Sequence, residues 1–299
     1  ARSGVGEADL RGIGHRGGGT MIAPPTDDPN AEQGTLSIVG IGPGSPDHLT
    51  DAARSAITGA DVVYAAELYQ RFLRSDGLLS ADEKTAAPTV IESERGRQAE
   101  LAIESFERVR SGQDVVHVSG GDPNVYGKSD LLLSVAANDG YTDIDIEVIP
   151  RVTAALGGAA SLGSPLSNDV ATISLSDAWR DWDEIERKLR GATEVGFVLA
   201  LYNGWRALGR AIDVVRERRS DDTLVAVLED VTRGELGRNP AGETVTIATL
   251  GSVMADAPDE PTPGLLAIVG TEETRVVRTD HGQLLLTPRG DIELEAFDP

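Results

Sequence analysis

The chain has 299 residues, no cysteine and a formal net charge of -22. This length allows two domains with cores of ordinary size, and the lack of cysteine excludes disulfides, thiolate nucleophiles and zinc–thiolate sites. The large negative charge disfavours a nucleic-acid partner, because the two molecules would repel each other.

The basic residues are almost all arginine, since the only lysines are Lys84, Lys128 and Lys188. An acidic, lysine-poor surface suits a cytosol near molar salt, where charges are screened within roughly 3 Å. We therefore predict a protein of a halophile. No stretch approaches the ~20 apolar residues of a membrane span, and no signal-like segment opens the chain. We expect a cytoplasmic protein with no membrane partner.

Residues 1–34 are rich in glycine and proline and have no apolar periodicity, so we expect them to be disordered. The chain then alternates short β-branched runs with helical patterns, as a parallel sheet with crossover helices requires. In this first half Thr50 is the predicted N-cap of a helix. The predicted strands are 35–41, 61–64, 114–119 and 144–149, and the predicted helices are 49–59 and 95–111.

The second half opens with an Ala/Gly-rich helix over 152–162. Asp181 and Glu184 form a D-x-x-E capping arrangement before a helix that ends at Arg190. The predicted strands are 171–175, 195–201, 223–228, 243–248 and 265–269. We place the domain boundary near Ile149, which gives an N-terminal α/β domain at 35–149 and a C-terminal α/β domain at 150–270. Residues 271–299 form an appended hairpin or a loose tail.

The stretch Val118–Gly127, V-S-G-G-D-P-N-V-Y-G, is a turn-rich loop between a strand and a helical segment. Its glycines allow φ > 0 and close approach of a ligand, and Asp122 is an acceptor-only carboxylate. The loop suits a small cationic ligand. A second glycine–proline loop, 40–46, follows the first predicted strand, so two strand ends should meet at one crevice.

Several common kinds of site are not supported by the sequence. The loop at 40–46 fails the dinucleotide spacing, because Ser45 replaces the third glycine and Pro43 lacks an N–H for phosphate; a tight turn without ligand contact is the alternative. No two of the four histidines have ligand spacing, so we predict no metal site. His48 lies beside this loop. No nucleophile elbow, paired-carboxylate signature or P-loop is present.

Four residues follow predicted strands in the second half: Ser176, Asp177, Tyr202 and Asn203. Strand ends are where ligands bind in such sheets. Turn capping explains Ser176 and Asp177 about as well as ligand binding does. Tyr202 and Asn203 are equally open to a structural interpretation, unless other loops meet them.

Taken together, the loops resemble the tetrapyrrole methylase family, the class III S-adenosylmethionine-dependent methyltransferases. The family pattern V-x-G-x-G-P-G-D-P-x-x-L-T is matched at Gly40, Gly42, Pro43, Gly44, Pro46, Leu49 and Thr50, with Ser45 in place of the usual Asp. The S-G-D-P-x-x-Y-G element is matched at Gly121, Asp122, Pro123, Tyr126 and Gly127. The E-V-x-P-G-x-T-A element is matched at Glu147, Val148, Pro150, Thr153 and Ala154.

The resemblance implies two α/β domains with mixed, mostly parallel sheets and a cofactor cleft between them. It also implies a homodimer. S-adenosyl-L-methionine would be contacted from one side by Gly121, Asp122, Val125 and Tyr126, and from the other by Thr153, Ala154, Tyr202 and Asn203. A tetrapyrrole substrate would be bordered by Gly42, Pro43 and Gly44. Its carboxylates need cationic partners, for which the candidates are Arg95 and Arg233, together with Arg71 and Arg151.

The second half is most similar to the branch that methylates C-17 of precorrin-3B or cobalt-factor III in corrin (cobalamin) biosynthesis. That reaction includes ring contraction with lactone formation, which needs acid–base help, and Ser176 and Asp177 are the predicted catalytic residues. The chain departs from the family pattern at Arg151, Asn168, Gly204 and Gly264. Two alternatives therefore stay open. One is another member of the family, such as a C-11 methylase of precorrin-4 or a diphthine synthase; the other is a non-catalytic paralogue that binds cofactor or tetrapyrrole.

Overall fold

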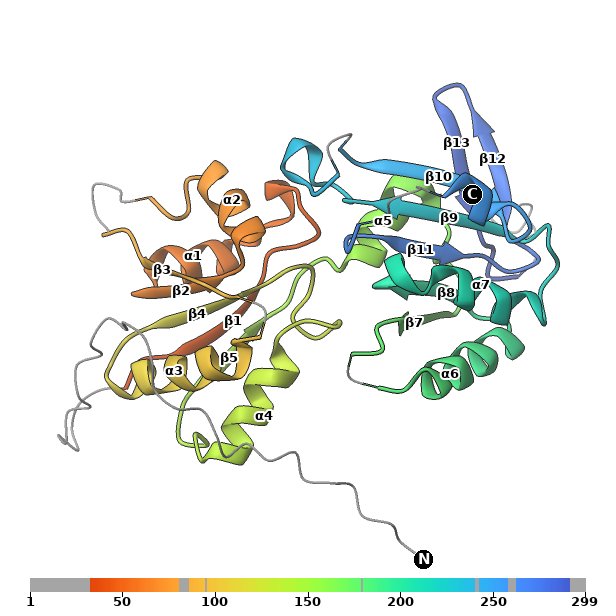
Figure 1. The fold of residues 1–299 in the computed structure, drawn as a ribbon. Coiled ribbons are helices and arrows are strands. Elements are labelled where there is room, and N and C mark those ends of the chain that lie inside the picture. The colour runs from red at the N-terminus through yellow and green to blue at the C-terminus, as the bar shows by residue number, and fades with distance from the viewer. Residues whose placement is uncertain are drawn as a thin grey trace, which may run out of the picture.

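The structure is a computed structural model that describes residues 33–80, 86–94, 96–178, 180–239, 242–257 and 262–290. Two lobes lie side by side, each built on its own sheet, and the chain passes from one to the other between β5 and α5 (Figure 1). Almost all of the predicted disordered segment 1–34 falls outside the described residues.

The first lobe holds a parallel five-stranded sheet in the order β3-β2-β4-β1-β5. Its strands are β1 (Leu36–Gly40), β2 (Val62–Ala65), β3 (Thr89–Glu92), β4 (Val115–Ser119) and β5 (Ile146–Ile149). Its helices are α1 (Asp51–Gly59), α2 (Glu67–Ser75), α3 (Gln98–Arg110) and α4 (Ser129–Asp139), with a 3-10 turn η1 at Pro46–His48. The Thr50 side chain accepts a hydrogen bond from the Ala53 N–H, which confirms the predicted N-cap.

Helices cover both faces of this sheet. Side chains of α1 and α2 form one core cluster with Val39, Val63 and Val118, and those of α3 and α4 form another with Ile38 and Tyr64. The chain therefore leaves β1 toward one face and leaves β4 toward the other, although these strands are neighbours. Ligands bind at such a switch point in open α/β sheets.

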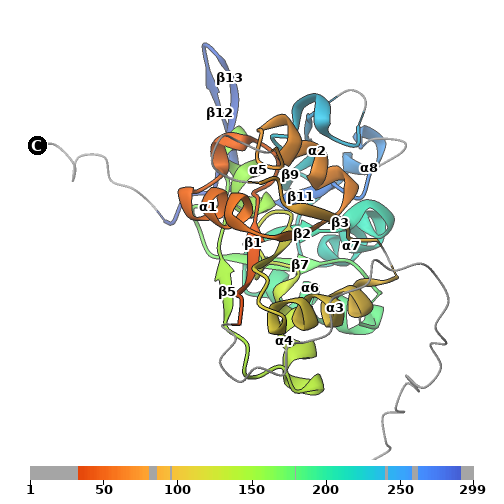
Figure 2. The same cartoon turned by 90° about the vertical axis from the view of Figure 1, so that its left-hand side faces the viewer.

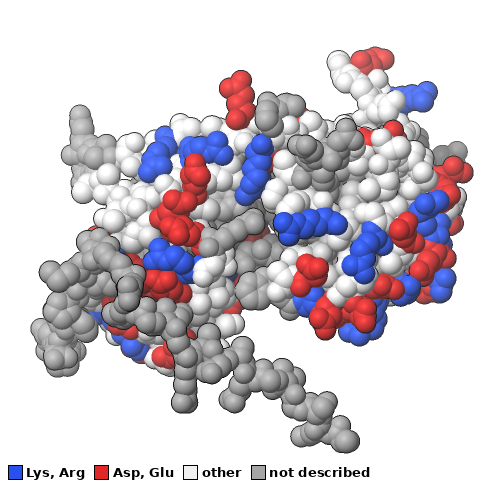
Figure 3. All heavy atoms as spheres, in the orientation of Figure 1, with Lys and Arg blue, Asp and Glu red and all other residues white. Residues whose placement is uncertain are grey.

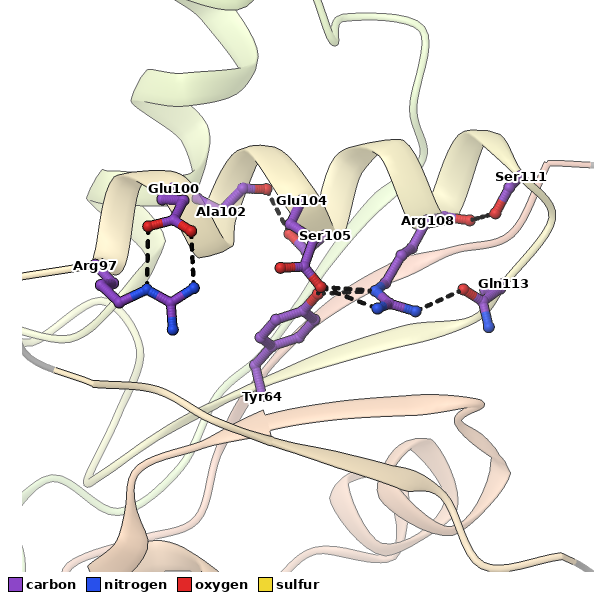
Figure 4. A network of polar contacts seen from close by, with 9 residues as sticks. All are labelled: Tyr64, Arg97, Glu100, Ala102, Glu104, Ser105, Arg108, Ser111 and Gln113. Carbon is purple, nitrogen blue, oxygen red and sulfur yellow. Dashed lines mark hydrogen bonds and ion pairs between the residues drawn. The ribbon is translucent and has the colours of Figure 1, made fainter. Parts of the chain in front are cut away.

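A polar network joins the sheet to α3 (Figure 4). The Tyr64 hydroxyl lies 3.0 Å from Oε1 of Glu104 and accepts a hydrogen bond from Nε of Arg108 at 3.1 Å. Arg108 also donates to the Gln113 side chain. Burial, reinforced by the Glu104 charge, raises the pKa of Tyr64. The Tyr64 hydroxyl therefore stays neutral, and its hydrogen bonds hold α3 against the sheet.

The second lobe holds a five-stranded sheet in the order β10-β9-β11-β8-β7. Its strands are β7 (Val170–Ser174), β8 (Val198–Tyr202), β9 (Leu224–Glu229), β10 (Thr244–Thr249) and β11 (Leu266–Val269). Its helices are α5 (Ala154–Leu162), α6 (Trp182–Glu194), α7 (Leu208–Arg216) and α8 (Val253–Asp256), with 3-10 turns η2 (Gly204–Arg206) and η3 (Gly234–Leu236). Only β7 and β8 pair in parallel here, and the other neighbours in this sheet are antiparallel. The predicted α/β fold with mixed, mostly parallel sheets is confirmed, with the parallel pairs concentrated in the first lobe.

The predicted D-x-x-E capping box at α6 is wrong in its side-chain bonding. Asp181 is the N-cap residue but makes no side-chain capping hydrogen bond. Glu184 instead forms an ion pair with Lys188, one turn along the helix. The ion pair with Lys188 competes for the Glu184 side chain, which explains why Glu184 does not take part in a capping box.

A hairpin formed by β12 (Arg275–Thr279) and β13 (Gly282–Leu286) projects from the second lobe in both views (Figures 1 and 2). β13 pairs in parallel with the short strand β6 (Gly163–Ser164) after α5. Thr274 and Thr287 share a buried hydrogen bond of 2.8 Å at its base. The base of the hairpin is therefore fixed to the lobe.

Charges of both signs alternate over α6 and α7, at the lower right of Figure 3. Several of them form exposed ion pairs, including Arg190 with Glu217 and Arg216 with Asp221. Exposed pairs of this kind contribute little to stability individually. Within the described residues, no helix has both the length and the apolar character needed to cross a membrane.

Candidate cofactor and substrate site

The two glycine loops of the first lobe meet directly. Gly42 and Gly121 form an isolated antiparallel bridge, in which the Gly121 N–H donates to Gly42 O at 2.8 Å and the Gly42 N–H donates to Gly121 O at 3.2 Å. Both residues have positive φ, 75° and 65°, which favours glycine. The predicted convergence of the two strand ends is therefore present, at the switch point between β1 and β4.

Asp122 ties the β4 loop to the loop after β5. Its Oδ1 accepts the Asn124 N–H at 2.8 Å and its Oδ2 accepts the Arg151 N–H at 2.7 Å. The residue is only 8% exposed. Asp122 thus holds two backbone N–H groups and positions the chain where the two glycine loops meet.

Tyr202 brings the second lobe to the same place. Its hydroxyl accepts the Ala155 N–H at 2.9 Å and lies 2.7 Å from Oγ1 of Thr153, a hydrogen bond between the two hydroxyls. Burial raises its pKa. Since Asp122 holds residue 151 and Tyr202 holds residues 153 and 155, the two lie against one short segment.

The β4 loop extends onto the second lobe. The Tyr126 ring lies 5.2 Å from that of Tyr202, centroid to centroid, and its hydroxyl donates to Thr172 O at 2.8 Å. Val125 packs against the core cluster that contains Tyr202, and so does Ala154. Seven of the eight predicted cofactor residues are thus brought together: Gly121, Asp122, Val125, Tyr126, Thr153, Ala154 and Tyr202.

The remaining predicted residues of the second lobe lie beside this group. Asn203 is exposed, has φ of 56°, and donates from Nδ2 to Oγ of Ser174 at 3.0 Å. The Ser176 N–H donates to the same Ser174 oxygen at 3.4 Å. Ser176 is half-buried and Asp177 is exposed. Ser176 therefore shares the Ser174 hydroxyl with Asn203, and Asp177 follows Ser176 in the chain.

The predicted substrate loop is held by the second lobe. Nε of Arg233 donates to Pro43 O at 2.8 Å, and Nη1 donates to Oδ1 of Asp230 at 2.9 Å. The Ser45 N–H also donates to Oγ1 of Thr232 at 3.2 Å. A Cβ built on Gly44 would lie 2.4 Å from Cγ of Arg233, so a larger residue would displace this side chain. Arg233 therefore latches the first glycine loop to the second lobe.

The other candidate arginines differ in their surroundings. Arg71 is exposed on α2, and Arg95 lies outside the described residues. Arg151 is 9% exposed, and its three guanidinium nitrogens are buried with no hydrogen-bond partner in the part of the chain that the structure describes. Burial, together with the neighbouring Arg54, lowers the pKa of Arg151 to about 10.

Lys128 was not among the predicted site residues. It ends the β4 loop, is half-buried, and donates from Nζ to Oγ of Ser93 at 2.8 Å, just beyond the end of β3. Burial lowers its pKa to about 8. The sequence did carry one signal for it: Lys128 is one of only three lysines in the chain, and it directly follows the motif at the end of the β4 loop. It places a cation at the same edge of the sheet as the glycine loops.

The depressed pKa of Lys128 predicts a pH-dependent stability. Below pH 8 Lys128 is protonated in both the folded and the unfolded protein, and the folded protein bears the full cost of burying the charge. Between pH 8 and the ordinary pKa of 10.5, Lys128 is neutral in the folded protein and protonated in the unfolded chain. The free energy of unfolding therefore rises with pH in this window. We expect the free energy of unfolding of the wild type to gain about 3 kcal/mol over that window relative to Lys128→Met. Urea unfolding at closely spaced pH values measures it. Lys188→Met, at an exposed ion pair, is the control and should leave the rise in place, whereas an unchanged rise in Lys128→Met would contradict the assignment.

Comparison with known proteins gives the family. The model of the Tetrapyrrole (Corrin/Porphyrin) Methylases matches residues 35–252. The chain belongs to this family, as the loop motifs predicted.

Two relatives are similar over nearly their whole length. A probable cobalt-factor III C(17)-methyltransferase of Salmonella typhimurium is 30% identical over 260 residues, which cover 85% of this chain and 98% of that protein. A precorrin-3B C(17)-methyltransferase of Sinorhizobium sp is 34% identical over 267 residues, which cover 86% of this chain and 96% of that protein.

Solved structures share the fold. The crystal structure of the methyltransferase CobJ matches with a TM-score of 0.70 at 24% identity, over 85% of this chain and 100% of that one. A uroporphyrin-III C-methyltransferase from Thermus thermophilus, complexed with S-adenosyl homocysteine, matches with a TM-score of 0.59 at 23% identity, over 79% and 97% of the two chains.

Proposed function

We propose that this chain is an S-adenosylmethionine-dependent C-methyltransferase that methylates C-17 of precorrin-3B or cobalt-factor III in cobalamin biosynthesis. The observation that carries the proposal is the meeting of four segments: the bridged loops at Gly42 and Gly121, the segment after β5, and Tyr202. The names of the two relatives supply the reaction.

The residues at the crevice fit the proposed methyl donor. Bare backbone at Gly121 permits close approach, and a Cβ built there would meet its nearest atoms, in Thr153 and Ala154, only at 3.8 Å. The Tyr126 ring is 42% exposed beside the buried Tyr202 and offers an aromatic surface. The first loop, at Gly42, Pro43 and Gly44, would border the tetrapyrrole, and Arg233 holds it from the second lobe.

When bound, S-adenosylmethionine supplies a methyl group on a sulfonium, and its transfer to carbon leaves the neutral thioether. The protein therefore needs no nucleophile of its own, and its contribution is to orient donor and acceptor at about 3 to 3.5 Å in a site that excludes water. Asp122 and Tyr202 fix the segment 151–155 from both lobes, and Arg233 fixes the loop at Pro43. These residues set the distance between the two binding loops.

Ring contraction requires proton transfer as well. We propose Ser176 and Asp177 for this step, because they follow β7 beside Asn203 at the edge of the second lobe. Asp177 is exposed, so it can exchange protons with solvent while free of substrate. We expect Asp177→Asn to bind both ligands as the wild type does and to form contracted product at least tenfold more slowly. Normal product formation in that variant would remove Asp177 from the mechanism.

Binding and turnover test the function separately. Calorimetry should show binding of S-adenosylmethionine and S-adenosylhomocysteine in molar potassium chloride. An anaerobic assay with each of the two tetrapyrroles, followed by mass spectrometry and carbon NMR, should show one added methyl group at C-17. A methyl group at C-11 would favour the other family activity, and cofactor binding without product would favour the non-catalytic paralogue.

We also propose a homodimer and adaptation to high salt. Neither is needed for the chemistry, but molar salt would weaken repulsion between an acidic protein and a polycarboxylate substrate. Light scattering at low and high potassium chloride gives the assembly state directly.

A further inference from the structure

Arg151 is a buried cation without a hydrogen-bonding partner. Its Nε, Nη1 and Nη2 are all buried, and none has a partner among the described residues. Burying a charge is costly unless it is paired, and buried charges in proteins are normally paired. The charge of Arg54, which acts on Arg151, has the same sign, and Arg54 is itself paired with Asp76. An anion bound at the Arg151 guanidinium would therefore offset the cost of burying its charge.

The position of the guanidinium shows where that anion would sit. The backbone N–H of Arg151 is held by Asp122, and from there the side chain runs along the β1 loop. A Cβ built on Gly40 would lie 2.7 Å from Cγ of Arg151, and one built on Gly42 would lie 3.4 Å from Nη2. The guanidinium therefore packs directly under Gly42, on the loop that the proposed function assigns to the substrate.

His48 lies beside the same glycine, Gly42. Its Cβ would lie 3.1 Å from a Cβ built on Gly42, and its Nδ1 is buried with no hydrogen-bond partner among the residues that the structure describes. Two orphaned polar groups, from η1 and from the segment after β5, thus flank one glycine. When neutral, His48 can donate from one ring nitrogen, which adds a neutral donor to a cationic one.

We propose that Arg151, with His48, forms a carboxylate-binding subsite beneath the first glycine loop. The proposal rests on the proposed function for the source of the carboxylate, which is either an acetate or propionate arm of the tetrapyrrole or the methionyl group of the cofactor. The flat guanidinium suits a carboxylate because two parallel N–H···O bonds can form. Since its nitrogens are closed to solvent, the carboxylate reaches them by a local movement around Gly42 and His48, while Arg233 keeps its bond to Pro43.

Arg151→Met tests the subsite, because it keeps most of the side-chain volume and removes the charge. Without ligand, its melting temperature should rise by roughly 2–6 °C, since an unpaired buried cation is lost. The dissociation constant of the tetrapyrrole, followed by quenching of protein fluorescence, should rise about 10- to 100-fold. If the methionyl group is the source, the dissociation constant of S-adenosylhomocysteine rises instead. Arg151→Lys should lose less affinity than Arg151→Met.

Arg219 is the matched control. It is also buried, but its guanidinium donates to the backbone oxygens of Phe197 and Gly270. Arg219→Met should lower the melting temperature and leave both ligand affinities unchanged. A rise in melting temperature for Arg151→Met and a fall for Arg219→Met would distinguish an arginine that binds a ligand from one that stabilises the fold.

A small carboxylate tests the subsite independently of the proposed function. Sodium formate, titrated at constant sodium concentration, should raise the melting temperature of the wild type and not that of Arg151→Met. That result supports the subsite even if no tetrapyrrole binds. Equal responses to formate, together with unchanged affinities for both ligands, overturn it. A fall in melting temperature in Arg151→Met also counts against it, because it would give Arg151 the structural role of Arg219.

Discussion

Asp122→Ala is expected to lower the free energy of unfolding by about 3–5 kcal/mol and to abolish measurable binding of S-adenosylhomocysteine. The carboxylate accepts two backbone N–H groups, from Asn124 and Arg151, and each charge-assisted bond contributes about 1.5–3 kcal/mol. Its removal leaves the Arg151 N–H without an acceptor in a buried position and the Asn124 N–H without one in a partly buried position, and it separates the loops after β4 and β5. Urea unfolding and calorimetry measure the two effects.

Two further variants sharpen this prediction. Asp122→Asn keeps one acceptor oxygen and should fall between the wild type and Asp122→Ala in both measurements. Asp130→Ala removes an exposed aspartate from the first turn of α4 and should change stability by less than about 1 kcal/mol. If Asp122→Ala bound S-adenosylhomocysteine with wild-type affinity, the loop after β4 would not be part of the cofactor site.

Arg233→Met is expected to lower the free energy of unfolding by about 3–5 kcal/mol, because it leaves the buried carboxylate of Asp230 without its cation. The Arg233 side chain is 13% exposed and that of Asp230 is fully buried. The same change releases Pro43, so we expect weaker tetrapyrrole binding with little change in cofactor affinity. Unfolding and the two binding assays give these quantities.

A double-mutant cycle tests the cause. Arg233→Met and Asp230→Asn should each be destabilising, and together they should cost clearly less than their sum, with a coupling of about 2 kcal/mol or more. Arg218→Met, which breaks an exposed pair with Glu194, should cost less than about 1 kcal/mol. Additive effects at positions 230 and 233 would show that the pair is not what holds the loop.

Much of the first lobe could be predicted from local patterns. The strands at β1, β2, β4 and β5 were predicted to within about two residues, because β-branched runs bounded by glycine and proline are strong local signals. The helix α2 was missed. It begins at Glu67, after the N-cap residue Ala66, which has no side chain able to cap the helix, so its start lacks the residue types by which a helix is recognised.

The second sheet was harder to predict for a different reason. Its strands were placed correctly to within a few residues, but the direction in which they pair is set by how connections cross the lobe. β11 lies between β8 and β9, antiparallel to both. No local pattern in a short apolar run distinguishes such a strand from a parallel one.

The sequence by itself determined the family and the two glycine loops, because these depend on backbone freedom and on short motifs within single loops. Only the tertiary structure decided what each charged side chain does. It committed Arg233 to Pro43 and Asp230, gave Asp122 two backbone donors, and buried Arg151 unpaired beneath Gly42. The physical reason is that the free energy of a charge depends on its burial and on its partners. Deciding partners such as Pro43 for Arg233 and the Arg151 N–H for Asp122 come from other segments of the chain, and for the Arg151 guanidinium the described residues supply none.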